Sequence, residues 1–162
     1  MIGTTGSGKT TFARSLAQKL GVRHVELDAL FWQPGWVMSS PDELRPKVEA
    51  ELGDEGWVVD GNYSTRLGSL VLGQADQIVW LDLPLRTTFP RVLGRTLRRL
   101  RTREVIWGTN RESFRSAFLS RDSILLYSLR AHRRFRRTRE QLLAGYPHVR
   151  LRTAREVERY LA

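Results

Sequence analysis

Residues 3–10 of the chain read GTTGSGKT, a glycine-rich run that ends in a lysine and a threonine. The spacing of Gly3 and of Gly8, Lys9 and Thr10 fits the pattern G-x-x-x-x-G-K-[ST] of a phosphate-binding loop. Glycine lets the backbone turn tightly enough for successive N–H groups to point at one anion. Because such a loop joins a strand of a parallel sheet to a helix, the run predicts an α/β fold.

The residues of this loop have expected partners in a bound nucleotide. The N–H groups are expected to surround the β- and γ-phosphates of ATP, and Lys9 is expected to reach the same oxygens. The hydroxyl of Thr10 would enter the Mg²⁺ shell, and Thr11 would contact the α-phosphate. The predicted nucleotide-binding set is Gly3, Gly6, Ser7, Gly8, Lys9, Thr10 and Thr11.

A helix is predicted directly after the loop, but only a stub of a strand precedes it. Phe12, Leu16 and Leu20 recur at helical spacing, and Gly21 ends the segment as a C′ glycine would. The strand before such a loop normally holds about five apolar residues, whereas only residues 1–2 stand here. We expect either that the natural start lies upstream or that the first strand is truncated.

Composition excludes several classes of site. The chain has 162 residues, no cysteine and three scattered histidines, so disulfides and thiolate metal sites are excluded and a metal would be held by oxygen atoms. This length fits a single domain. The sequence has neither an apolar run of about 18 residues nor a signal-peptide pattern. We therefore expect a cytoplasmic protein without membrane contact.

Basic residues are concentrated in the second half of the chain. Residues 1–85 carry 7 Lys/Arg and 11 Asp/Glu, a net charge of −4, whereas residues 86–162 carry 20 and 6, a net charge of +14. Nearly all are arginines, which grip phosphate through a planar fork, and such a half attracts polyanions. The run RRFRR at 133–137 resembles a nucleic-acid patch. Helical spacing spreads its arginines around the axis, however, and this favours a solvated helix anchored by Phe135.

Three short apolar segments each end in a carboxylate. Strands are predicted at 22–28, 57–60 and 78–82, and their last residues are Asp28, Asp60 and Asp82. Ser40 and Glu43 form a capping-box pattern for a helix that should end near Gly53. In a parallel sheet, ligands bind at the carboxyl ends of the strands. The three carboxylates and the glycine-rich loop should therefore lie along one edge.

The remainder is predicted to be mostly helical from residue 84 to about residue 144. A short strand should follow at 148–151, and Thr153 and Glu156 form a second capping-box pattern for a final helix. Phe114, Phe118, Leu125 and Leu129 are expected to share one apolar helix stripe, on which Arg121 also falls.

Together these motifs resemble the adenylate-kinase-like P-loop kinases of nucleosides and nucleotides. The resemblance rests on the loop, on WVVDGNY at 57–63, on ADQIVWLDLP at 75–84 and on the pair Arg91-x-x-x-Arg95. The stretch DALFWQPGW at 28–36 resembles more specifically a bacterial subgroup called topology modulation protein or adenylate-kinase-related ATPase.

The resemblance implies a three-layer α/β P-loop NTPase fold with a parallel sheet in the strand order 2-3-1-4-5 and a truncated first strand. It implies one domain, 1–162, with a small helical lid at about 96–120. It also implies ATP and Mg²⁺ as cofactors and a small-molecule acceptor. No oligomeric state is predicted.

Phosphoryl transfer requires positioned charges more than covalent chemistry. Asp60 is a candidate for a Mg²⁺-bound water or for a base near the acceptor hydroxyl; a turn aspartate that caps Gly61 is the alternative. Arg91 and Arg95 lie one helical turn apart and match the arginines of the family's lid hinge. Arg121 is either a third arginine for the γ-phosphate or part of an internal salt bridge. The predicted catalytic set is Lys9, Asp60, Arg91, Arg95 and Arg121.

A second set is predicted to contact the acceptor. Asp28 either touches the acceptor or caps the loop that follows it, and the two nearby tryptophans either stack on a flat substrate or pack as a lid over the core. Family kinases of nucleoside monophosphates usually have an arginine soon after the glycine at Gly61, a place that Asn62 occupies here. This departure argues against a monophosphate acceptor. The predicted substrate set is Asp28, Trp32, Trp36, Asn62 and Arg66.

The leading expectation is an ATP- and Mg²⁺-dependent kinase whose acceptor is a nucleoside, a nucleotide or a similar hydroxylated compound. The alternative is an ATP-binding regulator or ATPase that associates with nucleic acid through the basic half.

Overall fold

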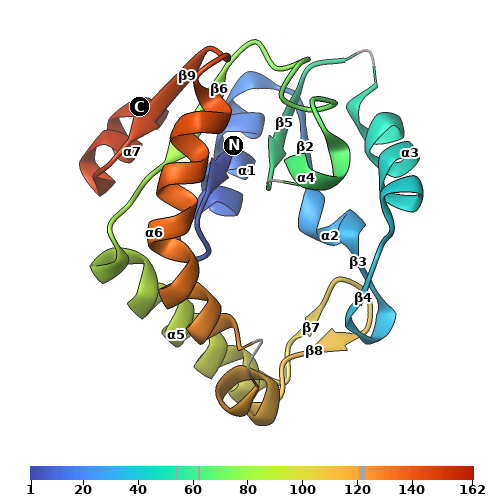
Figure 1. Cartoon of the computed structure of the whole chain (residues 1–162), viewed down its shortest axis with the longest axis vertical. Coiled ribbons are helices and arrows are strands. Elements are labelled where there is room, and N and C mark those ends of the chain that lie inside the picture. The colour runs from blue at the N-terminus through green and yellow to red at the C-terminus, as the bar shows by residue number, and fades with distance from the viewer. Residues whose placement is uncertain (54, 62, 121–122) are drawn as a thin grey trace.

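A computed structural model describes residues 1–53, 55–61, 63–120 and 123–162, without the side chains of residues 119, 131 and 133. Parallel strands and the helices that cover them form one end of the molecule, and two long helices, α5 (Leu85–Thr102) and α6 (Ile124–Leu143), run from there toward a small hairpin at the other end (Figure 1). The predicted α/β class is confirmed.

The parallel strands form two groups that meet at Met1. One group has the order β1-β6-β9 and the other pairs β2 with β5. The Met1 nitrogen donates to the Val59 oxygen at 2.6 Å, and the Met1 oxygen accepts from the Gly61 nitrogen at 3.2 Å, so hydrogen bonds join the groups. These strands are β1 (Ile2–Gly3), β2 (Arg23–Glu26), β5 (Trp57–Asp60), β6 (Ile78–Leu81) and β9 (His148–Leu151).

In the predicted order 2-3-1-4-5, the numbers 1 to 5 correspond to the parallel strands β1, β2, β5, β6 and β9. All three observed parallel pairings join neighbours in that order, and β1 is only two residues long. The remaining neighbours in that order, β5 and β1, do not form a strand pair among the described residues. The complete order therefore stays a prediction.

Three helices begin where the sequence signals predict, and the first two also end at the predicted glycines. Helix α1 (Lys9–Leu20) follows the glycine-rich loop and ends at Gly21, whose φ of 68° requires a residue that tolerates the left-handed region. Helices α3 (Pro41–Leu52) and α7 (Ala154–Leu161) both begin with the predicted capping boxes. In each box a hydroxyl and a glutamate satisfy backbone N–H groups that the first helical turn leaves free.

The predicted strand at 22–28 is wrong at its carboxyl end. Strand β2 ends at Glu26, and Asp28 lies in the first turn of a short helix, α2 (Leu27–Phe31). Leu27 and Phe31 are four residues apart and both are buried, so helical spacing places both in the core. The chain continues through β3 (Trp32–Gln33), the 3₁₀ turn η1 (Pro34–Trp36) and β4 (Val37–Met38).

The segment between residues 84 and 144 is helical in α5 and α6, but it is interrupted between them. A hairpin of β7 (Val105–Ile106) and β8 (Asn110–Arg111) follows α5, and a π-helical turn, η2 (Arg115–Leu119), precedes α6. The expected single stripe from Phe114 to Leu129 is therefore wrong, because these residues do not share one helix. A further short helix, α4 (Ser64–Leu67), follows β5. None of the described helices has the length and apolar composition that a membrane crossing needs.

Asp82, directly after β6, connects the sheet to α6. Its buried carboxylate accepts hydrogen bonds from Arg150 of β9 at 2.7 Å and from Arg136 of α6 at 2.9 Å. Arg150 also bonds Glu140 of α6 at 2.6 Å and lies over the Trp80 ring at 4.1 Å. Asp82 therefore has a structural use at the carboxyl edge of the sheet.

Candidate phosphate and acceptor site

The glycine-rich loop lies between β1 and α1 and packs against α5. Gly6 has a φ of 76°, and a Cβ at this position would lie 2.4 Å from the backbone oxygen of Thr88 and 2.6 Å from Val92. Gly8 has a φ of 88°. Both conformations are rare for residues with a side chain. Gly6 therefore allows the close approach of the loop to α5.

Lys9 and Thr10 begin α1, so they stand at the positive end of a helix dipole. Lys9 is half-buried, and in the described part of the chain its ammonium makes no hydrogen bond or ion pair. The hydroxyls of Thr4 and Ser7 are enclosed and also lack partners. A helix N-terminus that has a free cation and hydroxyl groups without hydrogen-bond partners is suited to bind an anion.

Helix α5 brings two of the predicted arginines to this loop. The Arg91 Nη1 atom lies 3.6 Å from the position of a Cβ on Gly8, and Arg95 Nη2 donates to the Thr5 hydroxyl at 3.3 Å. Burial lowers the pKa of Arg95, and the neighbouring Arg99 lowers it further. The Arg95 Nε atom is enclosed without a partner. An anion bound in the loop would offset this loss of hydration.

Asp60 lies at the end of β5, a strand that packs against α1. Because side chains alternate along a strand, Asp60 shares a face with Val58, which packs against Ala13 and Ala17 of α1. The carboxylate is fully buried; Oδ2 lies 3.2 Å from His24 Nε2, and Oδ1 is enclosed without a partner.

A free buried carboxylate oxygen fits a water or ion of a Mg²⁺ shell. Three or more acidic or histidine side chains do not gather as a metal site within the described ranges. A Mg²⁺ ion here would therefore take most of its ligands from nucleotide phosphates and water.

On the acceptor side, the side chain of Asp28 is held by Tyr63. The Tyr63 hydroxyl donates to Asp28 Oδ1 at 2.5 Å; burial raises the pKa of Tyr63, and Asp28 raises it further. The Tyr63 ring lies 4.5 Å from that of Phe31, and the Arg66 guanidinium lies 5.0 Å from the same ring. The Trp32 ring contacts Phe31 at 4.9 Å. Phe31 therefore gathers the predicted substrate residues around one aromatic centre.

The β7–β8 hairpin is fastened to this aromatic centre. Trp36 donates its backbone N–H to Asn110 Oδ1 at 2.8 Å, and Asn110 Nδ2 donates to the Gln33 oxygen at 3.0 Å. Trp107 Nε1 donates to Glu26 Oε1 at 3.1 Å, and its ring meets Trp36 edge-on at 5.9 Å. We call these five residues, Glu26, Gln33, Trp36, Trp107 and Asn110, the hairpin latch.

Sequence reasoning found Trp36 but missed the other latch residues. Trp36 and Trp107 have φ values of 60° and 43°, which are unusual for bulky side chains. The signal for the turn is the sequence WGTN at 107–110, in which Gly108 supplies a φ of 87°. The partners in segment 26–36 could not be found by local pattern, because they lie more than 70 residues away along the chain.

Two predicted site residues, Asn62 and Arg121, lie outside the described residues. The others fall into two neighbourhoods: the loop with Arg91, Arg95 and Asp60, and the aromatic centre with Asp28 and Arg66. Their roles in binding and catalysis stay predictions.

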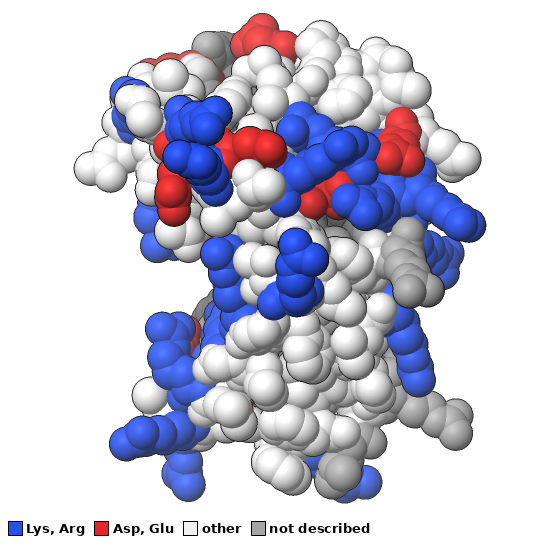
Figure 2. Space-filling view, turned by 90° about the vertical axis from the view of Figure 1, so that its left-hand side faces the viewer, with Lys and Arg blue, Asp and Glu red and all other residues white. Residues whose placement is uncertain are grey.

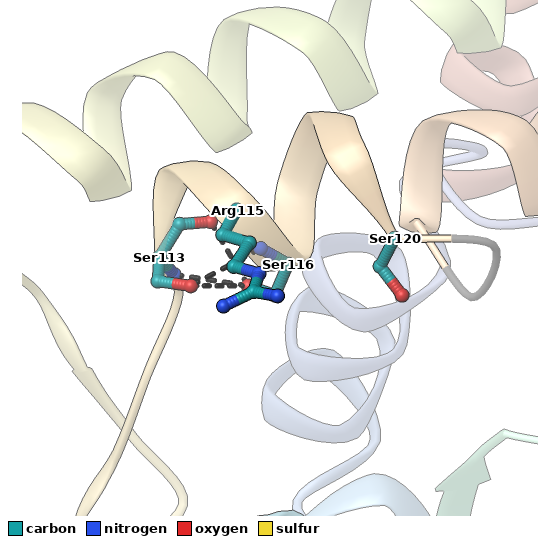
Figure 3. A pocket seen from close by; sticks show the side chains of 4 residues that line it. All are labelled: Ser113, Arg115, Ser116 and Ser120. Carbon is teal, nitrogen blue, oxygen red and sulfur yellow. Dashed lines mark hydrogen bonds between the residues drawn. The ribbon is translucent and has the colours of Figure 1, made fainter.

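A further hollow, of about 410 Å³, lies within segment 113–120 (Figure 3). It is lined by Ser113, Arg115, Ser116 and Ser120. The Ser113 hydroxyl donates to the Ser116 hydroxyl at 3.0 Å, and the backbone N–H of each residue donates to the hydroxyl of the other at 3.1 Å. These serines satisfy one another and close the turn that begins η2.

Comparison with known proteins identifies related sequences. Residues 1–52 match the model of the ATPase family associated with various cellular activities (AAA). A shikimate kinase of Sulfurihydrogenibium is 32% identical over 107 residues, covering 57% of this chain and 64% of the relative. A putative adenylate kinase of Pyrococcus abyssi is 37% identical over 103 residues, covering 59% and 51%. A cytidylate kinase of Pyrococcus horikoshii is 32% identical over 107 residues, covering 57% and 54%.

The chain thus spans about half to two thirds of the length of these curated relatives. All three are named as kinases of small molecules, and the loop with the helix behind it lies within the segment that matches the ATPase model. Together with the α/β fold, these matches confirm that the chain resembles the adenylate-kinase-like P-loop kinases.

Proposed function

We propose that the protein transfers a phosphoryl group from ATP, with Mg²⁺, to a small hydroxylated acceptor such as a nucleoside or nucleotide. One observation supports the proposal: the Lys9 ammonium is free at the start of α1, and Arg91 and Arg95 of α5 reach the same glycine-rich loop. The names of the relatives support the reaction class.

The chain's own residues divide the work of positioning. The N–H groups of residues 6–11 would hold the phosphates, while Lys9, Arg91 and Arg95 would face the charge that spreads over the transferring group. Asp60 would hold a water of the Mg²⁺ shell through its free Oδ1. Bound Mg²⁺ supplies neutralisation of the phosphate oxygens.

In this proposal Asp28 would orient the acceptor hydroxyl. One of its oxygens accepts from Tyr63, and the other has no partner in the described chain. Arg66 is already occupied, because its guanidinium stacks on Phe31 and donates to the Ser39 oxygen at 3.4 Å. The acceptor would therefore meet a carboxylate and aromatic walls at this side of the site.

The test is acceptor-dependent release of ADP across a panel of nucleosides, nucleotides and hydroxylated acids. The proposal expects ADP release to rise above the rate with ATP alone for at least one acceptor, and the phosphorylated product to be detected by mass spectrometry. ADP release that no acceptor changes would contradict it.

The net charge of +14 in residues 86–162 favours a second candidate, an ATP-binding regulator or ATPase on nucleic acid. On the face shown in Figure 2, however, acidic groups interrupt the basic ones in the upper half, and a broad uncharged surface separates them in the lower half. Duplex DNA binding at two salt concentrations tests this candidate. Tight, steeply salt-dependent binding without acceptor-dependent ADP release would favour it over the kinase.

A further inference from the structure

A cavity of about 510 Å³ lies between β5 and β6, at the end of the strands away from the glycine-rich loop. Its lining includes the starts of both strands, at Trp57 and Ile78, and the end of α1 at Leu20. Met1 also lines it, and Figure 1 marks this end of the chain between β6 and β5. The proposed function does not use this region.

Hydrogen bonds define the width of this cavity. On one side the Met1 nitrogen donates to the Val59 oxygen at 2.6 Å, and the Met1 oxygen accepts from the Gly61 nitrogen at 3.2 Å. On the other side β1 pairs with β6, with Ile2 opposite Trp80. The chain from Met1 onward therefore lies between β5 and β6, and the cavity continues its line toward the amino end. We call this cavity, between segments 57–59 and 78–79, the strand slot.

Both walls of the strand slot present backbone groups to it. Along a strand, the N–H and C=O groups of successive residues point alternately to its two sides. Because Val59 faces β1, Trp57, two residues earlier, faces the same side. On β6 the Ile78 nitrogen donates to the Pro147 oxygen on the β9 side, so Val79 faces the slot. An extended chain in the slot would therefore bond both strands at once.

Apolar side chains cover the strand slot on both faces. Met1 packs with Leu16 of α1 and Tyr160 of α7 on one face, and Ile2 packs with Leu72 on the other. Leu16, Leu72 and Tyr160 also line the cavity. Since successive residues of a strand point to opposite faces, every side chain of an added strand would meet apolar neighbours. Strands buried in this way are rich in valine and isoleucine, so the slot fits an apolar β-branched segment.

The Met1 ammonium indicates how such a segment would be attached. Burial lowers the pKa of this ammonium to about 6, although Asp60 opposes the shift. A separate peptide parallel to β1 would set its carboxyl end against the same nitrogen, so that two charged groups would have to be desolvated inside the sheet. A peptide bond at Met1 removes the charge and keeps the N–H that donates to Val59. The geometry therefore favours a segment joined to Met1.

We propose that an extended apolar segment, joined to the Met1 nitrogen, fills the strand slot and lengthens β1 at its amino end. The hydrogen bonds of Met1 place it opposite Asp60, so the three residues before it would lie opposite Val59, Val58 and Trp57. Because β1 leads directly into the glycine-rich loop, a longer strand would hold the start of that loop more firmly. The inference goes beyond the proposed function and does not depend on it.

Thermal unfolding of three extended proteins, each freed from a cleavable tag, tests the proposal. The first carries isoleucine-valine-valine before Met1. The second carries glycine-serine-glycine, which supplies the peptide bond without apolar side chains. The third carries isoleucine-proline-valine, whose proline removes the N–H that would donate to the Trp57 oxygen. The midpoint of the first should lie about 5–10 °C above that of the second, and the third should lose most of this gain. Equal midpoints of all three would overturn the proposal.

Amide hydrogen exchange checks where the segment binds. In the protein with isoleucine-valine-valine, the N–H groups of Val59 and Val79 should exchange at least about 10-fold more slowly than in the unextended protein. Unchanged exchange at both amides would place the extension elsewhere and overturn the proposal.

A peptide added in solution separates a joined segment from an independent partner. The same tripeptide, acetylated and amidated, is mixed with the unextended protein, and its effect on the thermal midpoint is expected to be much smaller than that of the joined segment. An equal rise with the free tripeptide would identify a separate strand as the occupant and overturn the inference of a joined one.

Discussion

Lys9 is half-buried at the start of α1, and its ammonium has no acceptor in the described part of the protein. Lys9→Ala should therefore cost the fold little, while nucleotide affinity should fall roughly 100-fold because a charged hydrogen bond to phosphate is lost. Isothermal calorimetry with MgATP measures the change, and Lys47→Ala, at an exposed site of α3, is the control. Equal MgATP affinity of the wild type and Lys9→Ala would contradict the assigned role.

Individual residues were predictable where a local rule fixes them. The capping pairs Ser40–Glu43 and Thr153–Glu156 need only neighbours three residues away, and both are present. The burial of Arg139 in α6, which is 7% exposed, was not predicted, because its sequence context, a run of arginines on a helix, is typical of a solvated face. Its burial depends on what α6 packs against, and a helix pattern alone does not contain that information.

At the scale of elements, the contact between the phosphate loop and α5 depends on Gly6. Gly6→Ala should lower the free energy of unfolding by about 2–4 kcal/mol, because a Cβ combines a left-handed backbone with a collision against the Thr88 backbone. Gly21→Ala isolates the backbone term: its φ is 68°, nothing lies within 4 Å of the added Cβ, and about 1 kcal/mol is expected. Urea unfolding measures both losses. Equal losses would show that the loop does not press on α5.

The hairpin latch yields a second prediction at this scale. Asn110 is 2% exposed and bonds both Trp36 and Gln33, so Asn110→Ala should lower the free energy of unfolding by about 2 kcal/mol. Release of the hairpin should also expose the two latch indoles and shift tryptophan emission to longer wavelength. Thr109→Ala, at an exposed position of the same turn, is the control. An unchanged emission spectrum and stability in Asn110→Ala would rule out a fastening role.

Elements with a strong period or cap were predicted, and short ones were not. Helices α1, α3 and α7 follow from their glycines and capping boxes. Helix α2 was mistaken for the end of a strand, because five residues give too short a window to separate the two periods. The two-residue strands of the hairpin escaped for the same reason, and long-range bonds from segment 26–36 help to hold them.

For the whole molecule, Asp82 holds sheet and helix layers together. Asp82→Asn should lower the free energy of unfolding by about 3 kcal/mol, because it leaves Arg150 partly buried without its carboxylate. Asp76→Asn, at an exposed position before the same strand, should change it little. Denaturant unfolding measures both free energies, and similar stabilities of the two variants would contradict the role of Asp82 in joining the sheet to α6.

The overall fold was predictable because its signals agree: a phosphate loop, strands of the right spacing and helices between them. The neighbouring positions of β1 and β5 followed less directly from the sequence. Strand β1 has only two residues, and its link to β5 consists of the hydrogen bonds of Met1, the residue before it. The contact between the β7–β8 hairpin and segment 26–36 could not be predicted from local sequence patterns either, because the latch pairs segments that are distant in sequence.

The latch carries a consequence for how such proteins diversify. Asn110 forms hydrogen bonds with the backbone of Trp36 and Gln33, and Trp107 donates one to Glu26. The hairpin and segment 26–36 are therefore complementary surfaces of one polypeptide. A graft that exchanges either piece alone with a relative would leave the other without its counterpart. Substitutions in the two segments should therefore occur in pairs. Such paired substitutions should mark the lineages in which acceptor preference has shifted.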